Sequence, residues 1–533
     1  MSAGTDARQA AQDTGPAWGR LSGRLVLVNL AILAAPVATL AAALAANGGR
    51  ANLQILITLG SLFSTFLVVC GISLMRLFTT RYRVTDERIE MRSGLFFRSH
   101  RSAPIERIRS VDLTANPVHR LFGLTTVRIG TGDQGSTAGR RLELEGIATA
   151  DAAELRRRLV AARDAARGRQ LPADQDGPIC ELDWSWLRYG PLTVWGVGGV
   201  FLVAGSVYRT LHEMHVDPLK LGVVKDVEAR FGSVPLWFGI LVALLIVVVF
   251  GTVGATAVYI ENWSGYQLRR EDGGMLLVRR GLLVTRSVSI EERRLRGVEL
   301  VEAIPLRWAG GARTNAIASG LGDREDNRRR RALTPPAPRA QALRVAAEVL
   351  AQDPGARSGS ATATGAGLMA GDGLTAHPRV ALRRRTNRAL TAVLLIAAVP
   401  LGLGLWLGPA LLVTAGVTAV VLLPVAVALA RDAYRALGHA VRGRYLVARS
   451  GTFARRTVAL QRDGIIGWRV SRSVFQRRAG LLTLGATTAA GEGIYQVRDL
   501  PVGAGLLLAE EAVPGLLAPF VERVEGAAGV SVR

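Results

Sequence analysis

Few residues of this 533-residue chain stand at spacings that catalysis requires. A Walker phosphate loop needs Gly-Lys-Ser or Gly-Lys-Thr after a glycine loop, and neither tripeptide occurs. The glycine-rich segment Gly130–Gly135 lies between the alternating apolar stretches 127–129 and 142–144, which favours a β-hairpin loop over a phosphate cradle. Four histidines have no recognisable triad context: His100, His119, His377 and His439. We therefore expect no catalytic residues, no cofactor and no enzymatic activity.

The best metal-ligand candidate is one short segment that contains both imidazole and carboxylate groups. Its members are His212, Glu213, His215 and Asp217. These groups are zinc ligands elsewhere, but their spacing differs from His-Glu-x-x-His. A solvated loop explains the same residues, so we expect no metal site.

Arginines are the stronger candidates for a binding site. Five of them, in segments that recur along the chain, could converge on phosphate head groups or acidic peptide segments through charge-assisted hydrogen bonds: Arg107, Arg109, Arg294, Arg296 and Arg462. Three more each stand three positions before a recurring glycine: Arg120, Arg307 and Arg477. The alternative is that the five are solvated strand faces, or that they pair with Glu106, Glu291 and Glu292. The run Arg328–Arg331 fits anionic lipid and a disordered basic loop equally well.

Composition favours a membrane over a nucleic acid as the source of the charge. The formal net charge is +24, hydrophobic residues make up 49% and the mean hydropathy is +0.26. The basic runs are not interleaved with aromatic residues that could stack on bases, so we expect no nucleic-acid partner. The two cysteines, Cys70 and Cys180, suggest neither a disulfide framework nor a metal site.

Six apolar runs approach the length of about 20 residues that a helix needs to cross a bilayer. They occur in pairs: 25–46 with 51–75, 187–208 with 234–260, and 389–407 with 410–430. Each pair is predicted to form a transmembrane hairpin, with Gly408 and Pro409 as the tight turn of the third. The spacing Gly404-x-x-x-Gly408 predicts close helix packing there.

Arginine placement predicts the orientation of these hairpins. The turns inside the pairs carry few uncompensated basic residues, whereas the outer flanks are crowded with arginine, as at Arg81, Arg83 and Arg383–Arg385. Because basic loops stay on the cytoplasmic side, both termini and the domains between the hairpins are predicted to be cytoplasmic in a multi-pass bacterial plasma-membrane protein. The anionic lipids of the inner leaflet are then the expected partners.

A repeat is visible between the hairpins. A tyrosine that opens an alternating strand follows each one: Tyr82, Tyr266 and Tyr445. A turn glycine comes next, then the arginine segment, and then a second glycine. The two glycines are 29 positions apart in all three units: Gly94 and Gly123, Gly281 and Gly310, Gly451 and Gly480. The pattern predicts three copies of a small β-rich domain.

Each copy is expected to end in a helix. The first is predicted at Asp151–Arg167, the second carries Leu343, Ala347 and Leu350 on one face, and the third covers 506–524 with breaks at Pro514 and Pro519. The segment 353–377 is predicted to be a flexible linker. The expected organisation is a tail (1–24), hairpin 1 (25–76), domain 1 (77–170), a linker (171–186), hairpin 2 (187–260), domain 2 (261–353), a basic linker (354–388), hairpin 3 (389–431) and domain 3 (432–533).

The motifs of the first copy carry a resemblance to a known family. They are the strand tyrosine, Gly94-Leu95-Phe96, the Ile-Glu-Arg-Ile-Arg-Ser-Val segment 105–111 and the Arg-Leu-Phe-Gly-Leu-Thr-Thr-Val segment 120–127. Together they resemble the bacterial pleckstrin-homology (PH) family of YdbT-like membrane proteins. The second copy lacks the Leu-Thr-x-Val continuation after Gly310, and the third has a degenerate arginine segment. The resemblance implies domains of two antiparallel sheets capped by a C-terminal helix, and it implies no catalytic residues.

The sequence thus predicts an α+β membrane protein with six transmembrane helices in three hairpins, alternating with three PH-like β-sandwich or barrel domains. The predicted function is a non-catalytic membrane scaffold whose cytoplasmic domains bind lipid head groups or protein partners at the inner leaflet. The alternative is a transporter, or an export or resistance component, that acts through the transmembrane bundle. The absence of ionisable residues near the centres of the six runs disfavours transport.

Overall fold

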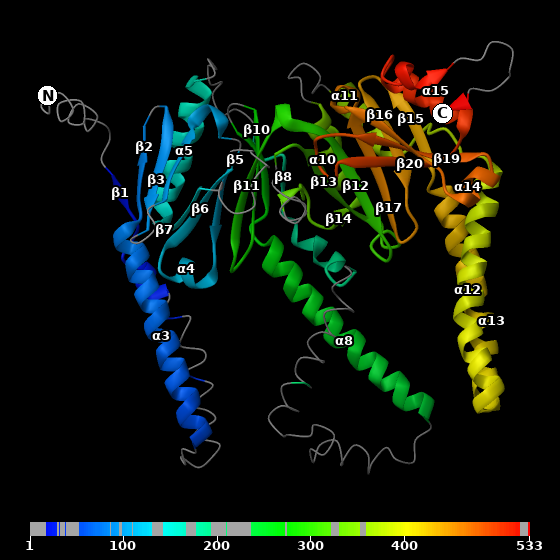
Figure 1. The fold of residues 1–533 in the computed structure, drawn as a ribbon, viewed down its shortest axis with the longest axis horizontal. Helices are drawn as coiled ribbons and strands as arrows, with labels where there is room; N and C mark the ends of the chain where they lie inside the picture. Colours follow the sequence, from blue (N-terminus) through cyan, green and yellow to red (C-terminus); the bar gives the residue numbers. More distant parts are fainter. Residues whose placement is uncertain are drawn as a thin grey trace, which may run out of the picture. The chain divides into compact units, whose positions relative to one another are not determined.

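The structure, a computed structural model, describes most of the chain. The described residues are 18–28, 31, 38, 53–85, 87–94, 99–108, 110–130, 142–166, 177–192, 209, 236–271, 274–320, 330–351, 359–522 and 531–532. They divide into two compact units (Figure 1). Unit 1 contains 1–182, 260–292 and 320–323, and unit 2 contains 183–259, 293–319 and 324–533.

The expectation of six transmembrane helices is wrong. Within the described residues two helices are long and apolar enough to cross a membrane, α12 (Arg379–Leu407) and α13 (Pro409–Arg435). Helices α3 (Leu53–Thr79) and α8 (Leu236–Trp263) are long but are not among these two. The runs 25–46 and 187–208 lie almost entirely outside the described residues.

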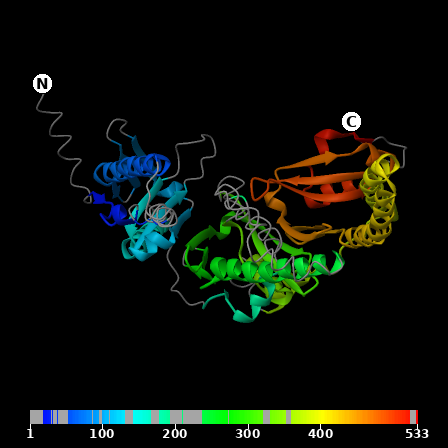
Figure 2. The ribbon, with the colours of Figure 1, turned by 90° about the horizontal axis from the view of Figure 1, so that it is seen from below.

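Helices α12 and α13 form the hairpin that the third pair of runs predicted, and they lie side by side in Figures 1 and 2. Gly408 joins them with φ +138°, and Pro409 takes the first helical position, where no amide donor is needed. A Cβ added at Gly404 would lie 2.7 Å from the backbone nitrogen of Leu412. The close packing expected from the small-residue spacing is confirmed at this position.

Unit 1 contains two antiparallel sheets. The first has the order β1 (Gly19–Arg20), β2 (Arg81–Val84), β3 (Arg88–Ser93), β4 (Ser99–Pro104). The second has the order β7 (Leu142–Ala148), β6 (Leu124–Gly130), β5 (Ser110–Ala115), β11 (Thr285–Glu291), β10 (Met275–Arg280), β9 (Gln267–Glu271), β8 (Cys180–Glu181). Strand β5 follows β4, and short helix α4 (Pro117–Leu121) separates β5 from β6. The pairing of β6 with β7 confirms the predicted hairpin around 130–135.

Helix α5 (Thr149–Ala166) closes the first domain, as its sequence predicted. Its apolar face packs with both sheets in one core that includes Ile89, Leu124 and Leu159, each no more than 1% exposed. Burial of alternating strand residues and of one helix face is what fixes this small domain.

Unit 2 also contains a long sheet that joins strands from different parts of the chain. Its order is β14 (Ala337–Pro338), β13 (Gly311–Ala318), β12 (Leu295–Ala303), β17 (Ala454–Gln461), β16 (Tyr445–Ser450), β15 (Gly438–Arg442). A separate three-stranded sheet has the order β18 (Gly467–Ser471), β19 (Leu481–Thr487), β20 (Ile494–Pro501). Helices α10 (Arg339–Leu350), α14 (Val474–Arg478) and α15 (Val502–Ala512) accompany these strands.

Strands β15–β20 and α15 make the third domain around its own core, which includes Leu446, Leu460 and Leu484. The strand after the hairpin is β15, and Tyr445 opens the next one, β16, so the predicted strand at this tyrosine is confirmed. Helix α15 ends at Ala512, ahead of both helix-breaking prolines.

The recurring glycines have the backbone conformation that their role requires. All six have positive φ, from +63° at Gly480 to +131° at Gly451. At Gly281 and Gly451 an added Cβ would lie 2.0 and 1.9 Å from a carbonyl oxygen across the turn. No other residue type fits these two turns without displacing the backbone.

One predicted linker contains regular structure. Within 353–377, helix α11 (Gly359–Ala370) contacts α10, and a Cβ at Gly365 would meet Ala347 at 3.1 Å. The small residues of this segment suggested a flexible linker by composition. In the structure they allow α10 and α11 to approach closely.

Candidate functional site

The most connected polar group in the described residues is the carboxylate of Asp499 on β20. Its side chain is buried to 1% exposure, and its φ is +61°, a left-handed conformation that aspartate tolerates better than most residues. The register between β19 and β20 shifts beside it, between Leu482 and Leu484. This bulge directs Asp499 into the domain, because an extra residue changes the alternation of side chains along a strand.

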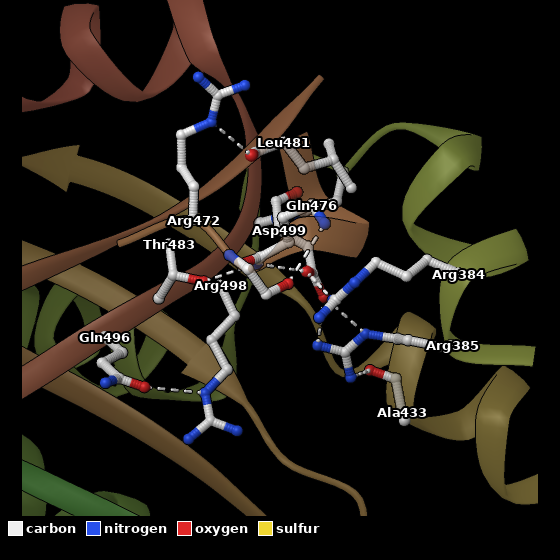
Figure 3. A network of polar contacts seen from close by, with 12 residues as sticks. Arg384, Arg385, Ala433, Arg472, Gln476, Leu481, Thr483, Gln496, Arg498 and Asp499 are labelled. Carbon is white, nitrogen blue, oxygen red and sulfur yellow. Dashed lines mark hydrogen bonds and ion pairs between the residues drawn. The ribbon is translucent and has the colours of Figure 1, made fainter. Parts of the chain in front are cut away.

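Three side chains converge on this carboxylate (Figure 3). Arg385 donates to Oδ2 from Nε at 3.0 Å and from Nη2 at 2.9 Å, and Arg384 donates to Oδ1. Gln476 of α14 donates to Oδ1 at 3.1 Å. Arg385 also donates to the carbonyl of Ala433 at 3.2 Å. Asp499 therefore fastens the polar ends of both hairpin helices to the third domain.

Two histidines extend this cluster. His377 Nδ1 lies 3.2 Å from the carbonyl oxygen of Asp499, and its Nε2 lies 3.2 Å from Nδ1 of His439. A carbonyl can only accept, so His377 carries its proton on Nδ1, and its bare Nε2 accepts from His439. Tyr434 donates to the carbonyl of His377 at 2.8 Å. His377 is therefore neutral in this arrangement.

Burial holds the histidine pair in the neutral form. It lowers the pKa of His439 to about 4, with a further contribution from His377. Burial also lowers the pKa of His377, against the opposing effect of the hydrogen bond to Asp499. A proton added at His377 Nε2 would face the N–H of His439, so the pair loses its hydrogen bond when His377 becomes charged.

A second carboxylate, Asp432, lies close to the end of α13. Its Oδ2 is 2.7 Å from a guanidinium nitrogen of Arg307, and its Oδ1 is 3.4 Å from one of Arg455. The loop after β12 is also tied to the β16–β17 turn, because the amide of Ile304 donates to the carbonyl of Phe453 at 2.7 Å. Both loops thus lie at the polar end of the hairpin. Each loop exposes one large apolar side chain, Trp308 at 74% exposure and Phe453 at 69%.

A third carboxylate, Glu299, sits where β12 pairs with β17. It is 1% exposed, accepts from Asn315 at 3.0 Å, and lies 3.2 Å from Arg456 and 3.5 Å from Arg331. Both arginines also contact Glu492. Burial alone would raise the pKa of Glu492, but the hydrogen bond from Arg331 and the charge of Arg456 lower it overall.

The predicted binding arginines do not gather at one place. In the third domain, Arg462 donates to the carbonyls of Ala512, Glu511 and Gly443 at 2.5, 2.9 and 3.1 Å, so it caps the C-terminal end of α15. Arg296 lies along Gly464, whose added Cβ would meet its side chain at 3.0 Å. Arg294 is half-buried in the turn before β12.

The other candidates are divided in the same way. Arg120 donates to the carbonyl of Leu282, Arg307 binds Asp432, and Arg477 is exposed on α14. Arg109 and the side chain of Arg107 lie outside the described part of the chain. Of the run 328–331, Arg331 is buried in the Glu299 cluster, and Arg328 and Arg329 are outside the described residues.

Metal ligands do not cluster in the described residues, where no group of three or more histidine, cysteine or acidic side chains could hold an ion. The segment from His212 to Asp217 falls outside that part of the chain. The three paired carboxylates, buried Asp499 and Glu299 and half-buried Asp432, were not predicted. Their one signal in the sequence is an acidic residue in an otherwise apolar strand or helix end, which indicates a buried partner.

An apolar helix hairpin fastened to a small domain of two sheets and a helix defines a membrane-associated protein built on PH-like domains. Comparison with known proteins agrees. Residues 26–163 and 390–509 match the family described as the bacterial PH domain. The chain is 23% identical over 288 residues to the UPF0699 transmembrane protein YdbT of Bacillus subtilis (strain 168), across 50% of this chain and 55% of that relative.

These matches support the resemblance to the bacterial PH-domain, YdbT-like family that the sequence motifs indicated. The match spans about half of the curated relative's length. No solved structure matches the chain. Neither the family description nor the relative's name refers to an enzymatic activity.

Proposed function

We propose that this protein is a non-catalytic, multi-pass membrane scaffold whose PH-like domains lie on the inner leaflet and bind lipid head groups there. The observation that carries the proposal is the contact of Arg307 and Arg455 with Asp432 at the end of α13. It supports a position for Trp308 and Phe453 at the level of the lipid head groups, where aromatic side chains are favoured.

Charge supports the same orientation. Arginines crowd the domain end of the hairpin, and its other end is the uncharged turn Gly408–Pro409. Each arginine near an anionic leaflet contributes about 1 kcal/mol of attraction. No ionisable residue lies between Ala389 and Ala430, which favours an anchoring role for this hairpin over transport.

The test uses the full chain in nanodiscs with lipids that carry a quencher at the head-group or upper acyl level. Single cysteines replace Trp308, Phe453 or Leu507 in a background of Cys70→Ser and Cys180→Ser, and each is labelled with a small fluorophore. Leu507 is the matched control, because it is 71% exposed on α15, at the end of the domain away from the hairpin (Figure 1).

We expect quenching at positions 308 and 453 that increases with the anionic lipid fraction, and none at 507. Equal quenching at all three positions, or none at any, would contradict a domain surface seated on the bilayer. Flux of a solute through proteoliposomes that stops with a substitution inside α12 or α13 would favour the transporter alternative.

A further inference from the structure

Two strand junctions in this protein have the same register. In unit 1, β5 pairs with β11, with Ala115 opposite Thr285. In unit 2, β12 pairs with β17, with Glu302 opposite Arg455. The spacing of 187 residues from Ala115 to Glu302 equals that from Gly94 to Gly281, and the spacing of 170 from Thr285 to Arg455 equals that from Gly281 to Gly451. In both junctions a strand of one copy (β5 or β12) pairs with the third strand of the next copy (β11 or β17). The two pairs have the same alignment.

The third copy has the same receiving strand, β18. Among the described residues only β19 pairs with β18, and no described strand lies along its other edge. Ile466, directly before β18, is an apolar side chain with 65% exposure. An open strand edge beside apolar side chains is a template for adding a strand.

The charge of the receiving strand differs between the copies. At one equivalent position β5 carries Asp112 and β12 carries Glu299, which are 3% and 1% exposed. Glu299 pairs there with Arg456 of the incoming strand at 3.2 Å. In β18 the same position is Arg469, which is exposed. The β12–β17 junction places an acid on the receiving strand and a base on the incoming strand, so the open edge of β18, with its arginine, calls for an acidic incoming strand.

Strand β4, the counterpart in the first copy of the incoming strands β11 and β17, does not supply an acidic residue at this position. In the common register the β4 edge of a second copy would place Arg101 opposite Arg469. Like charges directly opposite each other on paired strands are destabilising. The open edge therefore disfavours head-to-tail addition of another copy and favours a strand with acidic residues.

We propose that β18 is a strand-acceptor site for an extended acidic segment of a partner protein. The segment pairs antiparallel with β18 and places a carboxylate within reach of Arg469, as Arg456 is placed within reach of Glu299. The proposal rests on the scaffold function proposed above and names the class of partner that the scaffold holds.

The probe is a fluorescent eight-residue peptide with the sequence of β17, Ala454–Gln461, carrying Arg455→Glu and Arg456→Glu. The control peptide keeps both arginines. Binding to the full chain in neutral phosphatidylcholine nanodiscs is measured by anisotropy. Because charge-assisted hydrogen bonds are worth about twice a neutral one, we expect the acidic peptide to bind about tenfold more tightly than the control.

Three variants separate strand pairing from general attraction to a basic protein. Arg469→Glu reverses the preference between the two peptides, and this exposed side chain can be changed without disturbing the core. Arg444→Glu, on an exposed arginine before β16, leaves binding unchanged. An acidic peptide N-methylated at alternate residues, which cannot pair along the edge, loses binding.

Equal binding of both peptides, no effect of Arg469→Glu, or equal loss with Arg444→Glu would overturn the proposal. Self-association of the chain that Arg469→Glu abolishes would identify a second copy as the occupant and would also overturn it. Quenching at position 308 is recorded in parallel in nanodiscs that contain anionic lipid and the quencher. If quenching persists while the peptide fails to bind, only the strand-acceptor proposal falls.

Discussion

Arg385 donates two hydrogen bonds to the same carboxylate oxygen of Asp499, at 3.0 and 2.9 Å, across 114 positions of the sequence. One residue lies in the first turns of α12, a helix long and apolar enough to cross a membrane, and the other in a bulged strand of the third domain. The pair joins an anchor to the domain that it carries.

Replacing Asp499 with asparagine should destabilise the protein by about 3 to 5 kcal/mol, because removing one member of a buried ion pair leaves the other charge uncompensated. Thermal unfolding of detergent-purified protein, followed by tryptophan fluorescence, measures the loss. Arg388→Ala is the control, since Arg388 is exposed on the same helix. Equal melting temperatures for Asp499→Asn and the parent would mean that the network contributes little.

Glu299→Ala should destabilise the strand junction by a similar amount, because it removes the carboxylate that Arg331, 10% exposed, faces in the β12–β17 region. Hydrogen exchange at the backbone amides of β17 would report the local loosening. Glu511→Gln, on an exposed side chain of α15, should leave this exchange unchanged. Protection of β17 that survives Glu299→Ala would show that backbone pairing and apolar contacts hold the junction alone.

Stability should fall as the pH is lowered from about 6.5 toward 4. Free histidine titrates near 6.5, whereas burial lowers the pKa of His377 and brings that of His439 to about 4, so the unfolded chain binds protons first. Each histidine contributes a slope of at most ~1.4 kcal/mol per pH unit in this window. Nearby Arg385 opposes protonation, and the hydrogen bond to Asp499 favours it.

The measurement is the melting temperature from pH 7.5 to 4.5. His439→Gln should flatten the profile, because glutamine still donates to His377 but does not titrate. His100→Gln, on an exposed strand residue, is the control and should leave the profile unchanged. A parent protein with a flat profile over this range would refute a neutral buried pair.

Gly451→Ala should be strongly destabilising, since an added Cβ would lie 1.9 Å from the carbonyl oxygen of Ala454 at a φ of +131°. Gly503→Ala has open space around it inside α15 and should be neutral or stabilise by about 0.5 to 1 kcal/mol. Chemical denaturation of both variants tests the contrast. Similar losses in both would indicate that glycine content, and not turn geometry, limits stability.

Much of the β structure could be predicted from the sequence, because its signals are local. The alternation after each apolar run and the glycine at each turn predicted strands such as β16 and the turn at Gly451. The helical face of Leu343, Ala347 and Leu350 predicted α10. These patterns reflect one residue's relation to its near neighbours, which sequence reasoning reads well.

Contacts between distant segments could not be predicted in this way. Nothing near Asp499 in the sequence identifies Arg384 and Arg385 as its partners. The placement of basic residues beside an apolar run was a sufficient reason for these two arginines. Arg462 looked like a ligand-binding residue because the carbonyls at the end of α15 lie about 50 positions away. The number of membrane spans was overestimated, since α3 and α8 are continuous helices but are not among the two described helices long and apolar enough to cross a membrane.

The junction between β12 and β17 also sets an order for making the protein. The seven residue pairs from Gly297 to Ala303 receive their partner strand only after the hairpin α12–α13 has been synthesised. Until then β12 has an unsatisfied edge, which in a growing chain is a site for aggregation. Synthesis of the hairpin therefore comes before completion of the upstream sheet, so a ribosome that stalls within α12 leaves a protein with an open strand edge.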